Sequence, residues 1–219
     1  MKIALCLLGL STGHNDKGNY VKSLDTGKSI QSNIIRDNVD VFIHTWNEDV
    51  HSINELTNLY QPKKSIFEKQ IMFDDTITKY HYVKSRWYSQ MKSIELKKQY
   101  EIENNFTYDF VMVSRFDCFY YTPINFTTLN STRFYTSNWP LSHLLTGFLD
   151  YWFISNSFNM DLFGGLYNKL DQYMEYLPNE EFKLSSHVLS KYHIEELGLA
   201  DNVSYMLNEP KDFKINRNY

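Results

Sequence analysis

The stretch that decides the fold is "FVMVSRFDCFYY", residues Phe110 to Tyr121. It is apolar and aromatic nearly throughout, but Arg115 and Asp117 stand inside it with one residue between them. An unpaired charge is costly to bury. The stretch therefore predicts a buried strand through Val113, after which the chain leaves the core and carries both charges into a cleft. The aromatic residues that follow are expected to return to the core.

Strand-like and helix-like runs alternate on both sides of this stretch. Strands of a parallel sheet read as continuous apolar runs, and helices repeat apolar residues three and four positions apart. We expect strands at residues 2–8, 40–45, 63–67, 107–113, 133–136 and 149–155, and helices at 28–38, 47–60, 85–103, 157–176 and 178–192. The alternation predicts an α/β fold with a mostly parallel sheet. No internal repeat divides the 219 residues, so we expect one domain.

Composition limits the partners of the chain. The net charge is -4 with a pI near 6.0, and no basic stretch is long enough to follow a phosphate backbone. We therefore expect no nucleic-acid partner. The aromatic residues (17 Tyr, 15 Phe and 4 Trp) are first of all core material, although flat rings also suit sugar faces.

The sequence also bears on the compartment. No apolar run reaches the roughly 18 residues of a membrane span, so we expect no transmembrane segment. The opening "MKIALCLLGLS" is similar to a short signal peptide, but its glycine and the lack of a cleavage site favour a buried strand. Cys6 and Cys118 both lie in apolar runs, as expected of free thiols in a reducing compartment. These features predict a cytoplasmic protein.

Ligands of open α/β sheets bind beyond the carboxyl ends of the strands. The residues that follow the expected first, second and central strands are Gly9, Ser11 and Thr12, then His44, Thr45 and Trp46, then Ser114, Arg115 and Asp117. These three groups converge only if the three strands are neighbours in a parallel sheet. Each also has a purely structural interpretation: a tight turn at the glycine, a core histidine, and a tryptophan that plugs the edge of the sheet.

Arg115 and Asp117 lie two positions apart, and alternate residues of an extended chain share a side. One carboxylate and one guanidinium would then face the same cleft. A carboxylate can hold a divalent cation, and a planar guanidinium can bind phosphate oxygens. The pair therefore suggests a diphosphate site, with a simple ion pair as the structural alternative.

Four stretches together resemble a known family. They are "KIALCLLGLS", "VDVFIHTWNED", "SRWYSQMKSIELKKQYE" and "VMVSRFD". In this order they resemble nucleotide-sugar glycosyltransferases of the GT-A fold, in particular the small domains of large DNA viruses and bacteria. The resemblance implies a single domain over residues 1–219, with a central, mostly parallel or mixed sheet flanked by helices. Residues 1–115 would form the nucleotide-binding half and residues 116–219 the acceptor half, in the host cytoplasm if the chain is viral.

The resemblance also implies a glycosyltransferase of the hexosyltransferase type, with a UDP-sugar donor, a glycan acceptor and Mn²⁺ or Mg²⁺. The metal would sit on Asp117, at the last position of the family's D-x-D motif. Arg115 replaces the first Asp of that motif, so either Asp117 holds the ion with diphosphate oxygens and water, or Arg115 supplies part of its charge. The donor-binding residues implied are Gly9, Ser11 and Thr12 at the nucleoside, His44 and Trp46 near the uracil or ribose, and Arg86 and Gln90 at the start of the long helix, whose N-terminus would favour phosphate.

An inverting transfer also needs a base for the acceptor hydroxyl. Asp150 in "GFLDYWFISN" is the expected catalytic base, and Tyr151 and Trp152 would stack on the acceptor sugar. Weaker alternatives for the base are Asp161, Glu180 and Glu181, and His143 or His187 could complete the metal site.

Two other functions remain open from the sequence. A nucleotidyltransferase that makes nucleotide sugars would share the sheet and the phosphate site. Its Gly-rich basic loop would follow the first strand directly, where this chain has Lys17 but no arginine. A noncatalytic carbohydrate-binding protein with a degenerate site is the other possibility, because one motif carboxylate is missing.

Overall fold

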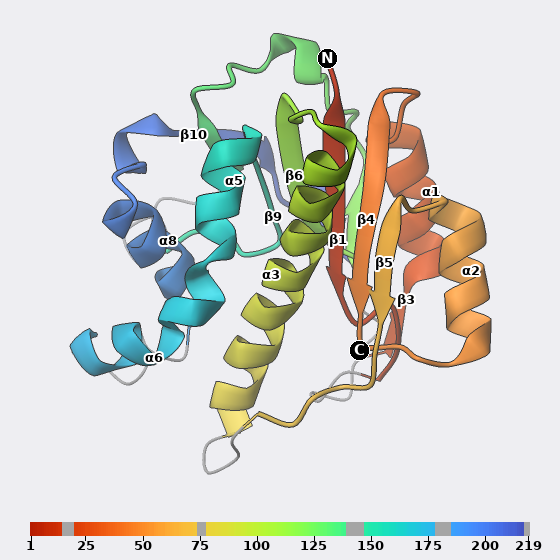
Figure 1. Ribbon diagram of the computed structural model, residues 1–219, viewed down its shortest axis with the longest axis horizontal. Coiled ribbons are helices and arrows are strands. Elements are labelled where there is room, and N and C mark those ends of the chain that lie inside the picture. Colours follow the sequence, from red (N-terminus) through yellow and green to blue (C-terminus); the bar gives the residue numbers. More distant parts are fainter. Residues whose placement is uncertain (15–19, 74–77, 139–146, 178–184, 217–219) are drawn as a thin grey trace.

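The computed structural model describes residues 1–14, 20–73, 78–138, 147–177 and 185–216 (Figure 1). Its centre is a seven-stranded sheet in the order β10-β8-β9-β6-β1-β4-β5. The strands are β1 (Ile3–Gly9), β4 (Val39–Thr45), β5 (Lys64–Phe67), β6 (Phe110–Arg115), β8 (Phe134–Asn138), β9 (Trp152–Ser155) and β10 (Val203–Asn208). Only β9 runs against its neighbours, so the expected mostly parallel α/β fold is confirmed.

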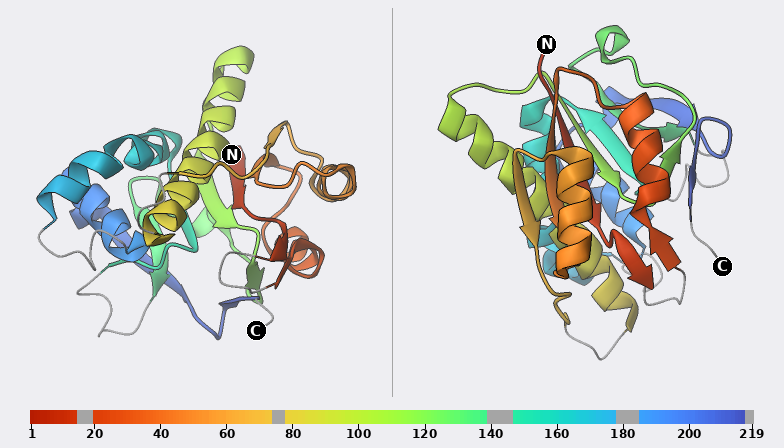
Figure 2. Two further views of the ribbon diagram at one scale, coloured as in Figure 1. Left: turned by 90° about the horizontal axis from the view of Figure 1, so that it is seen from below. Right: turned by 90° about the vertical axis from the view of Figure 1, so that its right-hand side faces the viewer.

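Helices cover both faces of the sheet (Figure 2). They are α1 (Ser23–Asn33), α2 (Val50–Tyr60), α3 (Thr78–Asn104), α5 (Ser157–Gly164), α6 (Leu166–Tyr176) and α8 (Ser186–Glu196), with short 3₁₀ turns η1 (Phe126–Thr128) and η2 (Ala200–Asn202). Two small antiparallel pairs complete the described chain: β2 (Thr12–His14) with β3 (Tyr20–Lys22), and β7 (Cys118–Tyr120) with β11 (Phe213–Ile215). Within these ranges no helix is both long and apolar enough to cross a membrane.

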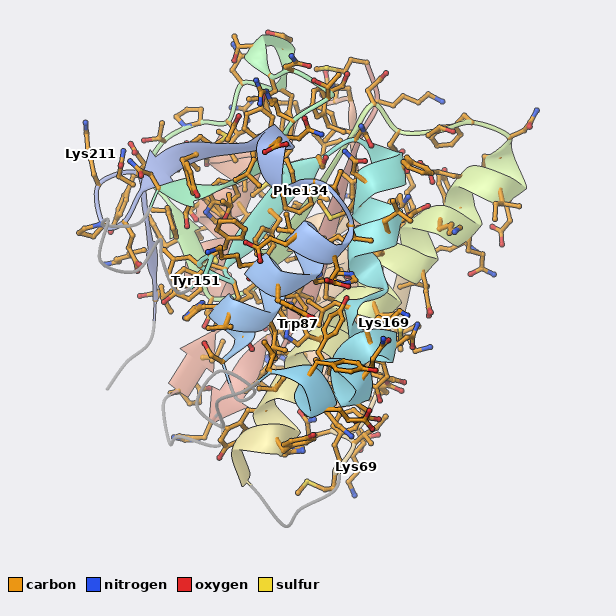
Figure 3. All side chains as sticks on the ribbon, turned by 90° about the vertical axis from the view of Figure 1, so that its left-hand side faces the viewer. Lys69, Trp87, Phe134, Tyr151, Lys169 and Lys211 are labelled. Atoms are coloured by element: carbon orange, nitrogen blue, oxygen red, sulfur yellow. The ribbon has the colours of Figure 1, made fainter. Side chains whose placement is uncertain are left out.

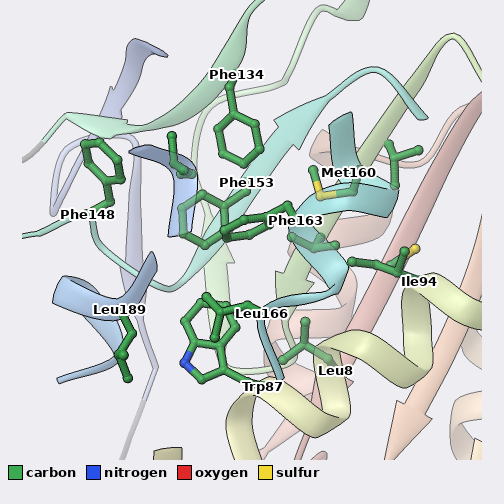
Figure 4. Close-up of a cluster of buried hydrophobic side chains, with 14 of the residues drawn as sticks. Leu8, Trp87, Ile94, Phe134, Phe148, Phe153, Met160, Phe163, Leu166 and Leu189 are labelled. Carbon is green, nitrogen blue, oxygen red and sulfur yellow. The ribbon is translucent and has the colours of Figure 1, made fainter. Parts of the chain in front are cut away.

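The alternation of side chains along β1 creates two cores. Cys6 and Leu8 point into one cluster with α3, α5, α6 and α8, whereas Leu5 and Leu7 point into another with α1 and α2. Figure 4 shows the first cluster, in which Trp87 of α3 packs among side chains of the sheet and the flanking helices. Figure 3 views the molecule from the side of these helices, which cover Trp87. Burial on both faces explains why the central strands read as unbroken apolar runs.

The connections place a switch point beside β1. The chain passes from β1 outward to β4 and β5, then returns through α3 to β6 on the other side of β1. In open α/β sheets such a reversal opens a crevice at the carboxyl ends of the two strands. Registers Gly9↔Thr45 and Leu8↔Arg115 bring the ends of β4, β1 and β6 to one edge. The assumption that these three strands are neighbours is therefore correct.

Several predicted bounds differ from the structure. The helix expected at 28–38 is α1, which begins at Ser23, and the helix expected at 157–176 divides at Gly165 into α5 and α6. Asp49 caps α2 by accepting the amide of Ser52 at 2.9 Å, so this helix begins after residue 47. Of the helix expected at 178–192, residues 178–184 lie outside the described chain and the rest is in α8. β10 and β11 were not predicted.

Candidate active site

The candidate site lies at the carboxyl ends of β1 and β6, where three segments meet. β6 extends to Arg115, two residues beyond the predicted end of the strand, and β7 carries Cys118 and Tyr120 back into the core as expected. β9 runs antiparallel to β6, so its first residues lie at the same edge. The amide of Arg115 donates to the carbonyl of Tyr151 at 3.1 Å. This contact brings Asp150 beside Arg115, although 35 residues separate them.

Arg115 and Asp117 form a two-pronged ion pair. Nε of the guanidinium lies 2.9 Å from Oδ1, and Nη2 lies 2.5 Å from Oδ2. The carboxylate is buried, with Asp117 only 4% exposed. Burial alone would lower the pKa of Arg115, but the negative charges of Asp117 and Asp150 outweigh burial and raise it. The two residues therefore form the ion pair that was the structural alternative. The pair lies at the edge of the sheet where the site was predicted.

Asp150 is held between two cations and a histidine. Its carboxylate lies 3.4 Å from Nε of Arg86, 3.3 Å from Nδ1 of His187 and 3.9 Å from Nη1 of Arg115. Burial would raise the pKa of Asp150, but His187, Arg115 and Arg86 together lower it. Burial lowers the pKa of Arg86 to about 10 despite the charge of Asp150. We call Arg86, Arg115, Asp117 and Asp150 the arginine–aspartate cluster.

Arg86 does not lie at a helix N-terminus. The predicted helix was expected to begin at Ser85, but α3 begins at Thr78, so Arg86 lies in its third turn. A phosphate at Arg86 therefore gains nothing from the first turn of this helix, and that expectation is wrong. Gln90 lies one turn further along α3, is 1% exposed, and has no hydrogen-bond partner for its amide within the described residues.

His44 is buried and links three elements. Its Nδ1 lies 2.7 Å from Oγ of Ser89, and its Nε2 lies 2.8 Å from Oε1 of Glu68. The same serine hydroxyl accepts the amide of Gly9 at 2.8 Å. Burial lowers the pKa of His44, partly offset by Glu68, so the neutral ring with its proton on Nε2 fits these contacts. The ring thus supports the end of β1 and has no face open to a nucleoside.

Trp46 is also packed against protein. It is 6% exposed, stacks on Tyr88 with ring centres 5.4 Å apart, and meets the edge of His44 at 4.8 Å. Its position beside the ends of β1 and β4 agrees with the prediction, but its ring acts as a plug there. Trp152 is likewise fully buried, so of the two expected acceptor platforms only Tyr151 is partly exposed.

Asn47 is a site residue that sequence reasoning missed. Its Oδ1 accepts the amide and the hydroxyl of Ser11, at 3.0 and 2.9 Å, and the amide of Thr12 at 3.2 Å. Its Nδ2 donates to the carbonyl of Thr12 at 2.9 Å. These bonds fix the turn after β1 to the end of β4. The signal was a polar residue two positions after a buried strand.

Glu209 is a second missed residue. It follows β10 and lies within electrostatic reach of Arg115 and His187. Burial raises its pKa, and the amide of Ile215, Arg115 and His187 only partly offset that rise. The tail of the chain is polar and weakly patterned, so nothing in the sequence pointed to it.

Of the weaker alternatives, the structure describes Asp161 and His187. Asp161 lies 2.6 Å from Nζ of the buried Lys97, in a separate cluster between α3 and α5. His143, Glu180 and Glu181 lie outside the described residues. His187, by contrast, contacts the cluster at Asp150.

The carboxylates at the expected metal position are already paired with cations. Across the described residues, no three His, Cys, Asp or Glu side chains are grouped so that they could hold a metal ion. Both oxygens of Asp117 face Arg115, and Asp150 is enclosed by Arg86 and His187. A metal on Asp117, completed by diphosphate oxygens and water, therefore stays a prediction, and it would compete with Arg115 for the carboxylate.

Comparison with known proteins gives similarity to solved structures. No family model matches the sequence, and no curated protein matches it. Among solved structures, a protein described as a "putative nucleotide-diphospho-sugar transferase" from Desulfovibrio desulfuricans G20 superposes with a TM-score of 0.47 at 9% identity. The match covers 95% of this chain and 81% of that one.

Proposed function

We propose that this chain is a glycosyltransferase that moves a sugar from a UDP-sugar to a hydroxyl of a glycan acceptor. The observation that carries the proposal is the position of the arginine–aspartate cluster at the switch point between β1 and β6. Nucleotides bind at this point in open α/β sheets. The resemblance of four ordered sequence stretches to GT-A glycosyltransferases supports the same function.

In this proposal each group at the edge has a defined task. The turn after β1, fixed by Asn47, receives the nucleoside at Gly9, Ser11 and Thr12. The guanidinium groups of Arg86 and Arg115 stabilise the negative charge that develops on the leaving diphosphate. Such preorganised donors act strongly because the site is largely dry.

The acceptor is proposed to lie on the β9 side. Asp150 takes the proton of the acceptor hydroxyl as its oxygen bonds to the sugar's anomeric carbon on the face opposite the diphosphate, so this single displacement inverts that carbon. Tyr151, whose ring stacks near Arg115 at 5.3 Å, offers a partly exposed face to the acceptor sugar. UDP leaves with the electron pair of the broken glycosidic bond.

The direct test is UDP release. The full chain would be incubated with a panel of UDP-sugars, with and without a mixture of glycan acceptors, and free UDP would be measured. Release that depends on one sugar supports the proposal. Asp150→Asn is the negative control, because it removes the proposed base while keeping the shape of the side chain.

A noncatalytic carbohydrate-binding protein is the second candidate. The observation that favours it is that both carboxylates of the cluster are already paired with arginines. This candidate predicts glycan binding with no UDP release from any donor. The same assay, combined with a glycan array, therefore separates the two functions.

A further inference from the structure

The geometry of Arg115 shows which of its nitrogen atoms are engaged. Nε and Nη2 both point at Asp117, and two parallel contacts of this kind fix the plane of a guanidinium. The third nitrogen, Nη1, lies 3.9 Å from Oδ1 of Asp150, which is beyond hydrogen-bond distance. Asp117 thus holds the guanidinium in one orientation and leaves Nη1 facing Asp150 without a hydrogen bond to it.

Arg86 supplies an independent observation at the same place. Its Nη2 donates to the carbonyl of Asp150 at 2.7 Å. Its Nε and Nη1 are buried and make no hydrogen bond within the described residues, although Nε lies in an ion pair 3.4 Å from Oδ2 of Asp150. Buried donors of a charged group are costly to leave unsatisfied. A ligand with several acceptor oxygens would satisfy them.

A cation at Asp117 would meet the opposite situation. It would have to displace the guanidinium of Arg115 from both carboxylate oxygens, and the displaced positive charge would then stand beside the metal. Like charges at such short range in a poorly solvated site repel strongly. The carboxylate is therefore better suited to position Arg115 than to bind a metal.

Resting on the proposed function, we infer that the donor's diphosphate binds through Arg115 and Arg86 without a divalent cation, and that Asp117 is a positioning residue for Arg115. The charges of the two guanidinium groups and the two carboxylates sum to zero, so net charge alone does not attract the diphosphate. Recognition of the diphosphate then depends on N–H groups that point at its oxygens. The planar guanidinium of arginine provides such donors better than the ammonium of lysine. The uridine part binds separately at the turn after β1.

The test is calorimetry with UDP, UMP and uridine on the full chain after removal of metals by a chelator. We expect UDP to bind at least about tenfold more tightly than uridine in the presence of EDTA, because charge-assisted hydrogen bonds reach the diphosphate. Added Mn²⁺ should change the UDP affinity by less than about twofold. UDP binding that requires Mn²⁺ would overturn this inference and leave the glycosyltransferase proposal standing. Absence of UDP binding under both conditions would remove both.

Variants separate the arginine from the carboxylate. Arg115→Gln should lower UDP affinity in EDTA by about tenfold or more and leave uridine affinity unchanged. Asp117→Asn should lower UDP affinity by the same factor with and without Mn²⁺, since it loosens Arg115, whereas loss of a metal ligand would alter only the value with Mn²⁺. Arg36→Gln is the matched control, because the exposed Arg36 donates to the carbonyls of Ser32 and Ile35, near the end of α1 and away from the site.

One further variant guards against misfolding. Arg115→Gln could destabilise the chain by leaving Asp117 buried without its guanidinium. The double variant Arg115→Gln/Asp117→Asn keeps the charge balance, and circular dichroism would check its fold. If this folded double variant binds UDP in EDTA as tightly as the unchanged chain, the inference is wrong.

Discussion

Oγ of Ser89 on α3 lies 2.7 Å from Nδ1 of His44 on β4, and the same hydroxyl accepts the amide of Gly9 at the end of β1. One side chain therefore joins a helix and two strands at the edge that carries the site. Ser89→Ala would leave the amide and the imidazole nitrogen buried without a partner. We expect the free energy of unfolding to fall by about 1–3 kcal/mol, measured by urea denaturation.

The control for this change is Ser32→Ala. Ser32 is exposed on α1, so its replacement should alter the free energy of unfolding by less than about 0.5 kcal/mol. Equal effects of the two substitutions would mean that the hydrogen bonds of Ser89 add no more to the free energy of unfolding than an exposed serine does.

His193 should make the fold sensitive to acid. It is buried on α8, where Nδ1 lies 2.6 Å from the hydroxyl of Tyr173 and Nε2 lies 3.3 Å from the carbonyl of Leu162. Burial lowers its pKa to about 4. In the unfolded chain this histidine takes up a proton near pH 6.5, whereas in the folded chain it stays neutral until about pH 4. The free energy of unfolding therefore falls as the pH decreases through this window. We expect a loss of about 3 kcal/mol from this group.

The measurement is urea denaturation at a series of pH values across that window. His193→Gln cannot titrate, so its stability should fall less steeply with acid than that of the unchanged chain. His51→Gln, at an exposed position on α2, should keep the original profile. An unchanged slope in His193→Gln would place the acid sensitivity elsewhere.

Lys97 and Lys98 are neighbours with very different expected contributions. Nζ of Lys97 is buried and contacts Glu101 at 2.8 Å, Asp161 at 2.6 Å and Ser157 at 2.5 Å. Lys97→Met would leave two carboxylates without their cation, so we expect a loss of about 3–5 kcal/mol in the free energy of unfolding.

Lys98 is the matched control, since its side chain is 57% exposed and its Nζ lies 3.7 Å from Asp161. Lys98→Met should cost less than about 1 kcal/mol. Similar losses for the two methionine variants would show that the buried network gives no more stability than a surface pair.

Sequence reasoning predicted the centre of the sheet because β1, β4 and β6 are buried on both faces and read as apolar runs. It missed β10, an edge strand whose side chains are all partly or fully exposed, because such a strand has no apolar face to display. The site, too, was predicted in part. The two-residue spacing of Arg115 and Asp117 predicted a shared side of an extended chain, but β6 ends at Arg115 and Asp117 lies in the following turn, where the two charges pair.

The neighbours of that pair could not be predicted for a different reason. Asp150 reaches Arg115 because β9 runs antiparallel beside β6, and strand direction is set by the packing of the whole sheet. Glu209 comes from a polar segment after β10 that carries no pattern. Long-range placement of this kind depends on tertiary contacts, which local periodicity does not encode.

The catalytic base can be tested by comparing Asp150 with Glu209. If Asp150 is the base, Asp150→Asn should lower turnover by about 10²–10⁴-fold while calorimetry still detects UDP binding, and Glu209→Gln should change turnover little. The reverse result is physically reasonable. Ion pairs lower the pKa of Asp150, which weakens it as a base, whereas burial raises the pKa of Glu209. Loss of turnover in Glu209→Gln alone would therefore move the base to the segment after β10 and leave Asp150 as the group that holds Arg86 in place.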